Sequence, residues 1–432
     1  MPQTPQKAGR ITTSPGPGSR AGRSITPITP GLVTTSARLA MTRNYGTVTE
    51  TADTSHGGRR SEVDAKLALI RKWLDANGLP GVALTRPGPV AWLTAGLTNP
   101  IDRSDPLSPL RLVVTAQNAA AVTTTVERPR LEAEAGLAEV GFTVEAVPWF
   151  DADAFVGAVE EIADAPRKEL GADGDARFGV DGDDDLTALR LRLLPPERER
   201  LARLGRDAAR ALEHAVSAWR PGEQDRDVQA RVAEELERVG ALPVCLIVGG
   251  DDRVERFRHP LATGRRVQRL VMAVVVAMRE GLHVAATRFA CAGGLTASVE
   301  GALSGARIVE AAMLAASRPG ATYGQVLGAC ERAYAQVGRP GAWQEHYQGG
   351  PVGYRQREFE LAPSQRQSRW FAQPIEPGQA VAWNPSLAGG GKSEDTFLVE
   401  DNGLLCVTQT GAWPLIEVKG GQPRSGVLDI AR

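Results

Sequence analysis

The 432-residue sequence lacks the long apolar stretch that a membrane-spanning helix requires. Its longest strongly apolar run, residues 270–278, has nine residues, whereas a bilayer needs about 20. Aromatic residues make up only 5% of the chain, and its four cysteines are widely spaced, with no Cys-x-x-Cys pair. These absences exclude a spanning helix and a clustered-cysteine metal site. They favour reduced thiols in a cytoplasmic protein.

Several motifs of enzymes and nucleic-acid-binding proteins are also missing. The sequence has no Walker loop, no His-Glu-x-x-His zinc motif and no Gly-x-Ser-x-Gly nucleophile turn. The chain beyond residue 60 is mildly acidic and has no basic stripe. We therefore expect neither nucleic acid nor a membrane surface as a partner.

Charge is unevenly distributed along the chain. The formal net charge of −1 conceals +6 on residues 1–60 and −7 on the remainder, and six prolines fall in the first 30 positions. Such a segment buries too little apolar surface to offset its ordering entropy, so we predict a disordered basic tail over 1–60. Its composition is similar to that of an organelle transit peptide. The scarcity of lysine favours the alternative, a start codon upstream of a functional Met41.

Residues 61–194 alternate helical and extended patterns, which predicts a small α/β domain. A helix is expected from Ser61 to Gly78, with helices near 130–138 and 152–164. Strands are expected at 81–86, 89–95, 110–116, 119–126 and 177–182.

Residues 195–432 show the same arrangement twice, two helices followed by antiparallel strands. The first copy is predicted to have helices at 195–222 and 225–240, a strand at 242–250 and a hairpin at 270–291. The second copy is predicted to have helices at 297–317 and 323–337 and strands at 356–361, 378–388 and 394–409. The predicted class is α+β, with a duplicated C-terminal domain behind a smaller N-terminal one.

Three segments carry a family resemblance: VVVAMREGLHVAATRF (274–289), QEHYQGGPVGYRQREF (344–359) and PGQAVAWNPSLAGGGKSEDTFLVEDNG (377–403). Together with the domain order, they make residues 61–432 resemble the creatinase/aminopeptidase P (pita-bread) superfamily. The resemblance implies a pita-bread domain over 195–432, a creatinase-type N-terminal domain over 61–194, and a homodimer.

The resemblance also implies a site where carboxylates and a histidine hold two metal ions in metal-dependent members. Carried onto this chain, His346 and Glu394 match two of five ligand positions. Val274, Ala285 and Asn384 stand at the other three. Because zinc generally needs at least three protein ligands, we expect no metal cofactor. One alternative is a replacement site formed by His283 with His346 and Glu394.

Eight residues are candidates for the site, each weighed against a purely structural role. The resemblance and the local sequence suggest catalytic roles for His259, His346, Glu394 and Glu358, and substrate binding by Arg288, Tyr354, Trp383 and Asn384. Histidines titrate near neutral pH and suit proton transfer. A buried Glu394 without a metal is expected to pair with a histidine or an arginine.

The resulting hypothesis is a metal-independent hydrolase that cleaves a C–N bond in a small amino-acid-derived or Xaa-Pro-like substrate. Two alternatives stay open: an Xaa-Pro aminopeptidase with an altered metal site, and a non-catalytic pita-bread domain that binds a peptide or a protein.

Overall fold

The computed structural model describes residues 56–99, 101–151, 153–362 and 367–431. Most of the predicted basic tail, up to residue 55, lies outside these ranges. The first described element, helix α1 (His56–Asn77), begins five residues before the predicted start at Ser61. Helix α6 begins at Pro195, the first residue of the predicted C-terminal domain.

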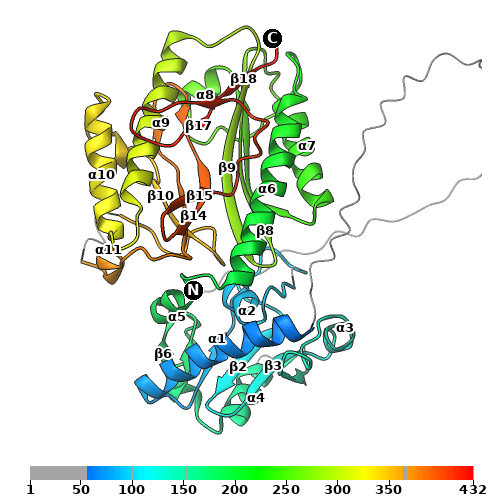
Figure 1. Ribbon diagram of the computed structural model, residues 1–432. Coiled ribbons are helices and arrows are strands. Elements are labelled where there is room, and N and C mark those ends of the chain that lie inside the picture. The colour runs from blue at the N-terminus through cyan, green and yellow to red at the C-terminus, as the bar shows by residue number, and fades with distance from the viewer. Residues whose placement is uncertain (1–55, 100, 152, 363–366, 432) are drawn as a thin grey trace, which may run out of the picture. The chain divides into compact units, whose positions relative to one another are not determined.

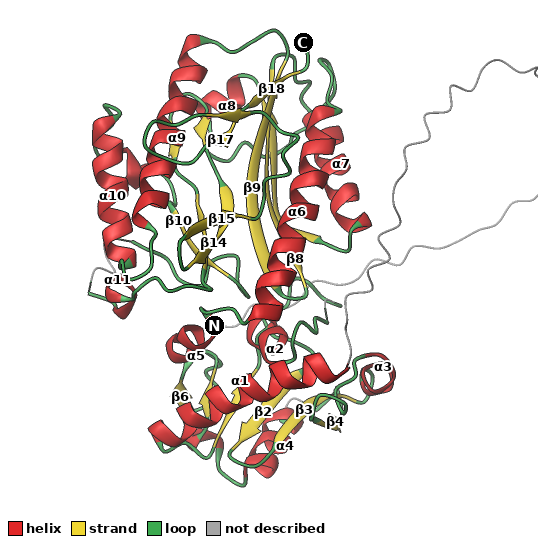
Figure 2. Ribbon diagram, in the orientation of Figure 1, coloured by secondary structure: helices red, strands yellow, loops and turns green. Residues whose placement is uncertain are grey.

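The N-terminal part is an α/β domain built on a six-stranded mixed sheet (Figure 1, Figure 2). Its strand order is β4-β3-β2-β1-β5-β6. The strands are β1 (Gly81–Leu84), β2 (Arg111–Thr115), β3 (Ala119–Thr124), β4 (Thr143–Val147), β5 (Gly171–Ala172) and β6 (Val180–Asp181). The other helices are α2 (Pro87–Leu93), α3 (Arg128–Glu134), α4 (Ala154–Ala163), η1 (Arg167–Glu169) and α5 (Asp183–Arg190).

Strand β1 shows why helices cover both faces of this sheet. All four of its residues are buried, and alternate side chains of a strand point to opposite faces. Val82 and Leu84 belong to the apolar cluster that includes α1. Ala83 belongs to the cluster that includes α4. A fully apolar strand is therefore sandwiched between two helical layers.

The strand predicted at 89–95 is wrong, because these residues form most of helix α2. Pro87 stands at the start of the helix, where the fixed φ of proline favours the first turn. Residues 89–93 are all buried, so the helix has no polar face. Without a polar face, a short buried helix cannot be distinguished from a buried strand by periodicity.

The C-terminal part contains two halves of similar composition. The first half contains α6 (Pro195–Ser217), α7 (Asp225–Arg238), β7 (Leu242–Gly250), α8 (Asp252–Arg256), β8 (Leu270–Arg279) and β9 (Leu282–Cys291). The second contains α9 (Ala297–Ala316), α10 (Tyr323–Gln336), η2 (Ala342–Glu345), β10 (Gly349–Val352), α11 (Arg369–Ala372), β11 (Ala380–Trp383), β12 (Ser386–Leu387), β13 (Gly391–Lys392), β14 (Asp395–Glu400) and β15 (Gly403–Cys406). Three short strands follow: β16 (Leu415–Ile416), β17 (Arg424–Ser425) and β18 (Val427–Asp429). The predicted α+β class with a duplicated C-terminal domain is confirmed.

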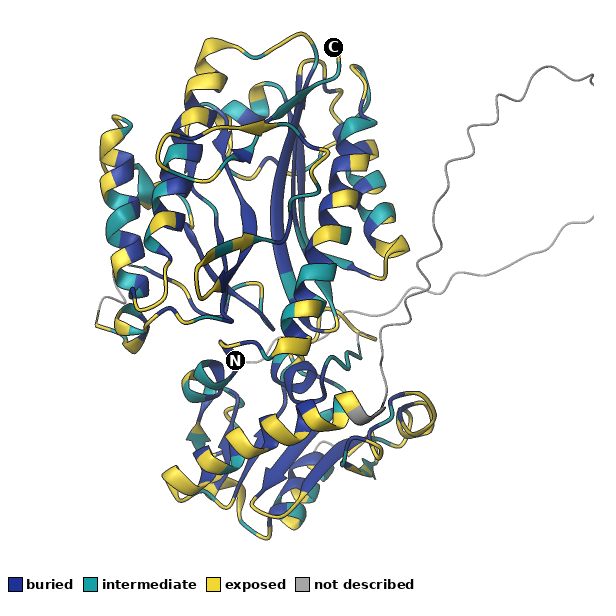
Figure 3. Cartoon of the chain, viewed as in Figure 1, coloured by how far each residue is buried: buried dark blue, intermediate teal, exposed yellow. Residues whose placement is uncertain are grey.

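The domain has two four-stranded sheets, ordered β18-β9-β8-β7 and β10-β11-β14-β15. The second half forms one of them, and the C-terminal strand β18 completes the sheet of the first half. The two sheets meet at β9 and β14. There the Ala285 amide donates to the Thr396 hydroxyl at 2.8 Å, and the Thr287 amide donates to the Glu394 carbonyl at 3.0 Å. Figure 3 shows β8 and β9 as almost wholly buried, with exposed residues on the outer faces of the helices. Val274, Ala285 and Glu394, which stand at three of the ligand positions implied by the resemblance, are buried in this interior.

The strand predicted at 356–361 is also wrong. Strand β10 lies earlier, at Gly349–Val352, and pairs with β11. Within 356–361, the Glu358 amide still bonds the Pro351 carbonyl at 3.0 Å. The Glu358 carboxylate, however, accepts hydrogen bonds from the Tyr354 and Arg355 amides, which holds this segment in a turn. Of the described helices, none is long and apolar enough to cross a membrane.

Candidate active site

Two histidines predicted separately come together in the structure. His259 lies in the loop after α8, and His346 ends the short helix η2. Their Nε2 atoms are 3.0 Å apart and their ring centroids 4.9 Å apart. The preceding residues, Arg258 and Glu345, form an ion pair at 2.5 Å, which ties the two loops together.

Lys392 is the site residue that the sequence analysis missed. It lies on β13 and is 4% exposed. Its Nζ donates to the Asn384 Oδ1 at 2.5 Å and lies 3.4 Å from the His346 Nε2. Among the described residues, no carboxylate lies within 4 Å of this Nζ. The available clue was rarity, since the chain has only six lysines and this one stands two positions before Glu394.

The donors and acceptors of this chain define the tautomers of both histidines. Lysine only donates, so the His346 Nε2 that faces Lys392 carries its lone pair and its Nδ1 carries the proton. The His346 Nδ1 is buried without a hydrogen-bond partner. The proton between the two rings must then belong to the His259 Nε2, which leaves the His259 Nδ1 as an acceptor.

Electrostatics keep both rings neutral. Burial, followed by the charge of Lys392 and the neighbouring His259, lowers the pKa of His346 to about 3. Burial and Lys392 also lower the pKa of His259. The pKa of Lys392 is itself lowered, chiefly by burial and against the attraction of Glu394. The pair therefore offers a neutral base at physiological pH.

Glu394 lies immediately before β14 and is 3% exposed. Its carboxylate accepts one hydrogen bond, from the Thr287 hydroxyl at 2.9 Å. The expected direct histidine or arginine partner is not found among the described residues. Burial raises the pKa of Glu394, and the positive charges of Lys392 and Arg357 oppose this rise. Glu394 is thus a buried carboxyl group with a raised pKa, two positions after Lys392.

Arg288 was expected to bind a substrate carboxylate, but it is completely buried in an ion network. Its guanidinium contacts Glu213 at 3.0 Å and Asp395 at 2.9 Å. On its far side, Asp395 contacts Arg424, which also pairs with Glu310 at 2.7 Å. All these groups are satisfied by one another. The network anchors β14, and with it the adjacent Glu394, and Arg288 has a structural role instead.

Glu358 and Tyr354, predicted as catalytic and substrate-binding residues, also hold structural positions. The Glu358 carboxylate pairs with Arg190 at 2.9 Å, and both side chains are buried. The Tyr354 hydroxyl donates to Glu197 at 2.6 Å, and its ring lies 5.5 Å from the Lys66 Nζ. These contacts hold elements together and leave neither group facing the histidine pair.

Trp383 and Asn384 are neighbours in sequence but differ in role. Trp383 is 1% exposed, donates its indole N–H to Ser317 at 2.9 Å, and packs in the apolar core of the second half. Asn384 follows β11 and bonds Lys392. Of the predicted residues, the structure thus brings His259, His346 and Asn384 together around Lys392, with Glu394 nearby. Arg288, Glu358, Tyr354 and Trp383 are structural.

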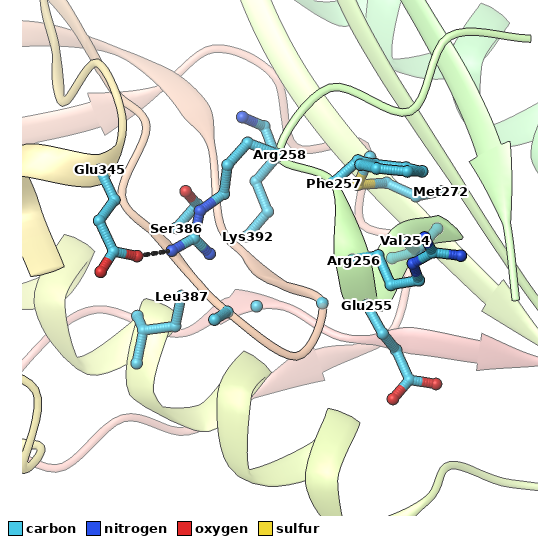
Figure 4. A pocket seen from close by; sticks show the side chains of 13 residues that line it. Val254, Glu255, Arg256, Phe257, Arg258, Met272, Glu345, Ser386, Leu387 and Lys392 are labelled. Atoms are coloured by element: carbon cyan, nitrogen blue, oxygen red, sulfur yellow. Dashed lines mark hydrogen bonds and ion pairs between the residues drawn. The ribbon is translucent and has the colours of Figure 1, made fainter. Parts of the chain in front are cut away.

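A cavity of about 170 Å³ is lined by Lys392 of this group (Figure 4), while His259 and His346 are not among its lining residues. Lys392, Arg258 and Glu345 line it together with apolar side chains such as Phe257 and Met272. Ser386 also lines it, and its hydroxyl is buried without a hydrogen-bond partner. The cavity is smaller than the roughly 300–1,000 Å³ of typical ligand pockets, and it combines charged and apolar walls.

The donor set does not fit the two metal ions of metal-dependent pita-bread enzymes. Val274 and Ala285 are buried on β8 and β9 and present only carbon. Asn384 is engaged by an ammonium group. The His283 Nδ1 contacts the Gly353 carbonyl at 3.1 Å. Across the described ranges, no three His, Cys, Asp or Glu residues are grouped to hold an ion, so the replacement site with His283 does not form.

Comparisons with known proteins agree with this architecture. Residues 199–401 match the model of metallopeptidase family M24. No curated protein matches the sequence. Among solved structures, a prolidase from Pyrococcus horikoshii OT3 is 18% identical, with a TM-score of 0.63 over 80% of this chain and 98% of that one.

Two further solved structures show how widely the fold is shared. Dipeptidase PepE from Mycobacterium ulcerans is 22% identical, with a TM-score of 0.65 over 81% of this chain and 96% of that one. The N-terminal domain of the FACT complex subunit SPT16 from Cicer arietinum (chickpea) is 11% identical, with a TM-score of 0.60 over 82% of this chain and 97% of that one. At these identities the likeness concerns the fold.

Proposed function

We propose that the chain is a metal-independent hydrolase of the creatinase/aminopeptidase P (pita-bread) superfamily. The match of residues 199–401 to metallopeptidase family M24 and the fold shared with the prolidase and dipeptidase structures support this assignment. The hydrolase cleaves a C–N bond in a small amino-acid-derived or Xaa-Pro-like substrate. The observation that carries this proposal is the neutral His259–His346 pair, held 3.0 Å apart beside a buried lysine.

In this mechanism His259 is the catalytic base. Its Nδ1 accepts a proton from the attacking water, whose oxygen adds to the scissile carbonyl carbon. The same proton then passes from Nδ1 to the nitrogen that leaves when the C–N bond breaks. His346 stabilises the protonated His259 by accepting its Nε2 proton in a hydrogen bond. Glu394 orients the cationic or amino end of the substrate.

The test is a turnover assay with two substrate groups, Xaa-Pro dipeptides and guanidino acids, each with a chelator and with added manganese, cobalt or zinc. We expect turnover of one group that the chelator leaves unchanged. Activity that appears only with an added metal would support an aminopeptidase with an altered metal site and would overturn metal independence.

A non-catalytic binding domain is the second candidate. Carbon side chains at Val274 and Ala285 favour it, since they remove the ligands of both hairpin positions. It predicts that a dipeptide raises the melting temperature but is recovered intact. The homodimer that the resemblance implies stays a prediction, which light scattering tests.

A further inference from the structure

The chain places a lysine among residues that stand at ligand positions implied by the family resemblance. The Lys392 Nζ contacts Asn384 and His346, which stand at two of the family's five ligand positions. It also acts through its charge on Glu394, at a third position. One ammonium group therefore lies among residues that correspond to metal ligands.

Lys392 has hydrogen-bonding capacity to spare. An ammonium group carries three N–H donors. One donates to the Asn384 Oδ1, and a second faces the His346 Nε2 at 3.4 Å, where the single lone pair already accepts the His259 Nε2 proton. Within the described chain no third acceptor and no carboxylate engages Lys392. Its side chain also lines the 170 Å³ cavity, as Figure 4 shows. A buried donor with a free N–H, on a side chain that lines a cavity and lies 3.4 Å from the histidine pair, is suited to bind an anionic oxygen.

The hairpin that carries Lys392 is built to hold it in place. Ser386 of β12 pairs with Lys392 of β13. The Ser386 amide is held in place because it donates to the Tyr334 hydroxyl at 3.0 Å. Tyr334 in turn donates to the Ser386 carbonyl at 3.1 Å. Both backbone groups of Ser386 are thus tied to a buried tyrosine of α10. Lys392 therefore needs little reorganisation when charge develops beside it.

We propose that Lys392 stabilises the oxyanion of the reaction, in place of the family's metal ions. The inference rests on the proposed hydrolase function. When water adds to the carbonyl carbon, the π electrons move to the carbonyl oxygen, and this oxygen accepts the third N–H of Lys392. When the C–N bond breaks, the pair returns to re-form the carbonyl and the hydrogen bond weakens. Lys392 keeps its protons throughout.

The experiment compares two tetrahedral probes that differ in charge. A phosphinic Xaa-Pro pseudodipeptide carries the anionic oxygen, and the matched hydroxyethylene isostere is uncharged. Calorimetry on the full chain is expected to show that the phosphinate binds at least about tenfold more tightly, the effect of one charged hydrogen bond. Lys392→Met removes this preference. Lys392→Arg keeps part of it, and Lys419→Met, at an exposed lysine, leaves it unchanged.

A second variant guards against misfolding of Lys392→Met. Asn384→Asp keeps the lysine but gives it a carboxylate partner, and it should also reduce the preference. The assignment is wrong if the wild-type protein shows no preference for the phosphinate, or if Lys392→Met retains it. Failure of the hydrolase function looks different: no substrate is turned over, while the lysine-dependent preference persists.

Discussion

The Nε2 atoms of His259 and His346 lie 3.0 Å apart, although 87 residues separate them in the sequence. The Arg258–Glu345 ion pair joins the residues just before them. Because Lys392 requires a lone pair on the His346 Nε2, the proton in this contact belongs to His259. In the proposed mechanism the two rings therefore have different tasks, with His259 as the base and His346 as its support.

Replacement of His259 by Asn should lower kcat on the order of 10²–10⁴-fold, the usual contribution of a general base. His259 is exposed, so its loss leaves the fold intact. Turnover and thermal unfolding measured together test this. His214→Asn is the matched control, because His214 is an exposed histidine on α6. Full turnover in His259→Asn would refute the assigned base.

Acidification should destabilise the protein through His346. Its pKa is about 3 in the folded chain and 6.5 in the unfolded one. Between these values the unfolded chain binds a proton that the folded chain does not. The contribution of neutral His346 is complete above pH 6.5 and is lost as pH falls toward 3.

Urea unfolding at pH 7.5, 6 and 5 measures this loss, which approaches about 1.4 kcal/mol per pH unit for one proton. The unfolding free energy of His346→Asn should depend less on pH than that of the wild-type protein. Equal pH dependence in the two proteins would contradict the half-buried, neutral His346.

Arg424→Met should destabilise the fold by about 3–5 kcal/mol, because it leaves Glu310 and Asp395 as buried carboxylates without this partner. Arg238→Met is the control. It breaks an exposed helical pair with Glu234, worth about 0.5 kcal/mol or less. Chemical denaturation compares the two, and similar losses would show that the network contributes little.

Gly349→Ala should destabilise the β10–β11 pair. Gly349 has a φ of +93°, and an added Cβ would lie 2.3 Å from the Ala382 carbonyl oxygen. Gly411→Ala is the control, since Gly411 has a φ of +79° but open space around it. Gly411→Ala should lose only the about 1–2 kcal/mol of left-handed backbone strain. If Gly349→Ala and Gly411→Ala unfold at the same denaturant concentration, the steric argument is contradicted.

Local patterns predicted the elements best where the polar and apolar residues repeat regularly. The strand at 242–250 and helices 297–317 and 323–337 were placed within one residue of β7, α9 and α10. Prediction failed at 89–95, where burial on every side removes the pattern. It failed again at 356–361, where the Glu358 carboxylate accepts hydrogen bonds from the Tyr354 and Arg355 amides and holds the segment in a turn.

The amino-acid sequence alone determined the fold class and the duplicated halves, and it named His259 and His346 as candidates. These depend on residue identity and on local periodicity. Only the tertiary structure decided which charged groups face the site. It placed Arg288 and Glu358 in buried ion pairs and put Lys392 beside His346. The partners of a buried side chain come from segments far apart in the sequence, so local sequence patterns do not predict them.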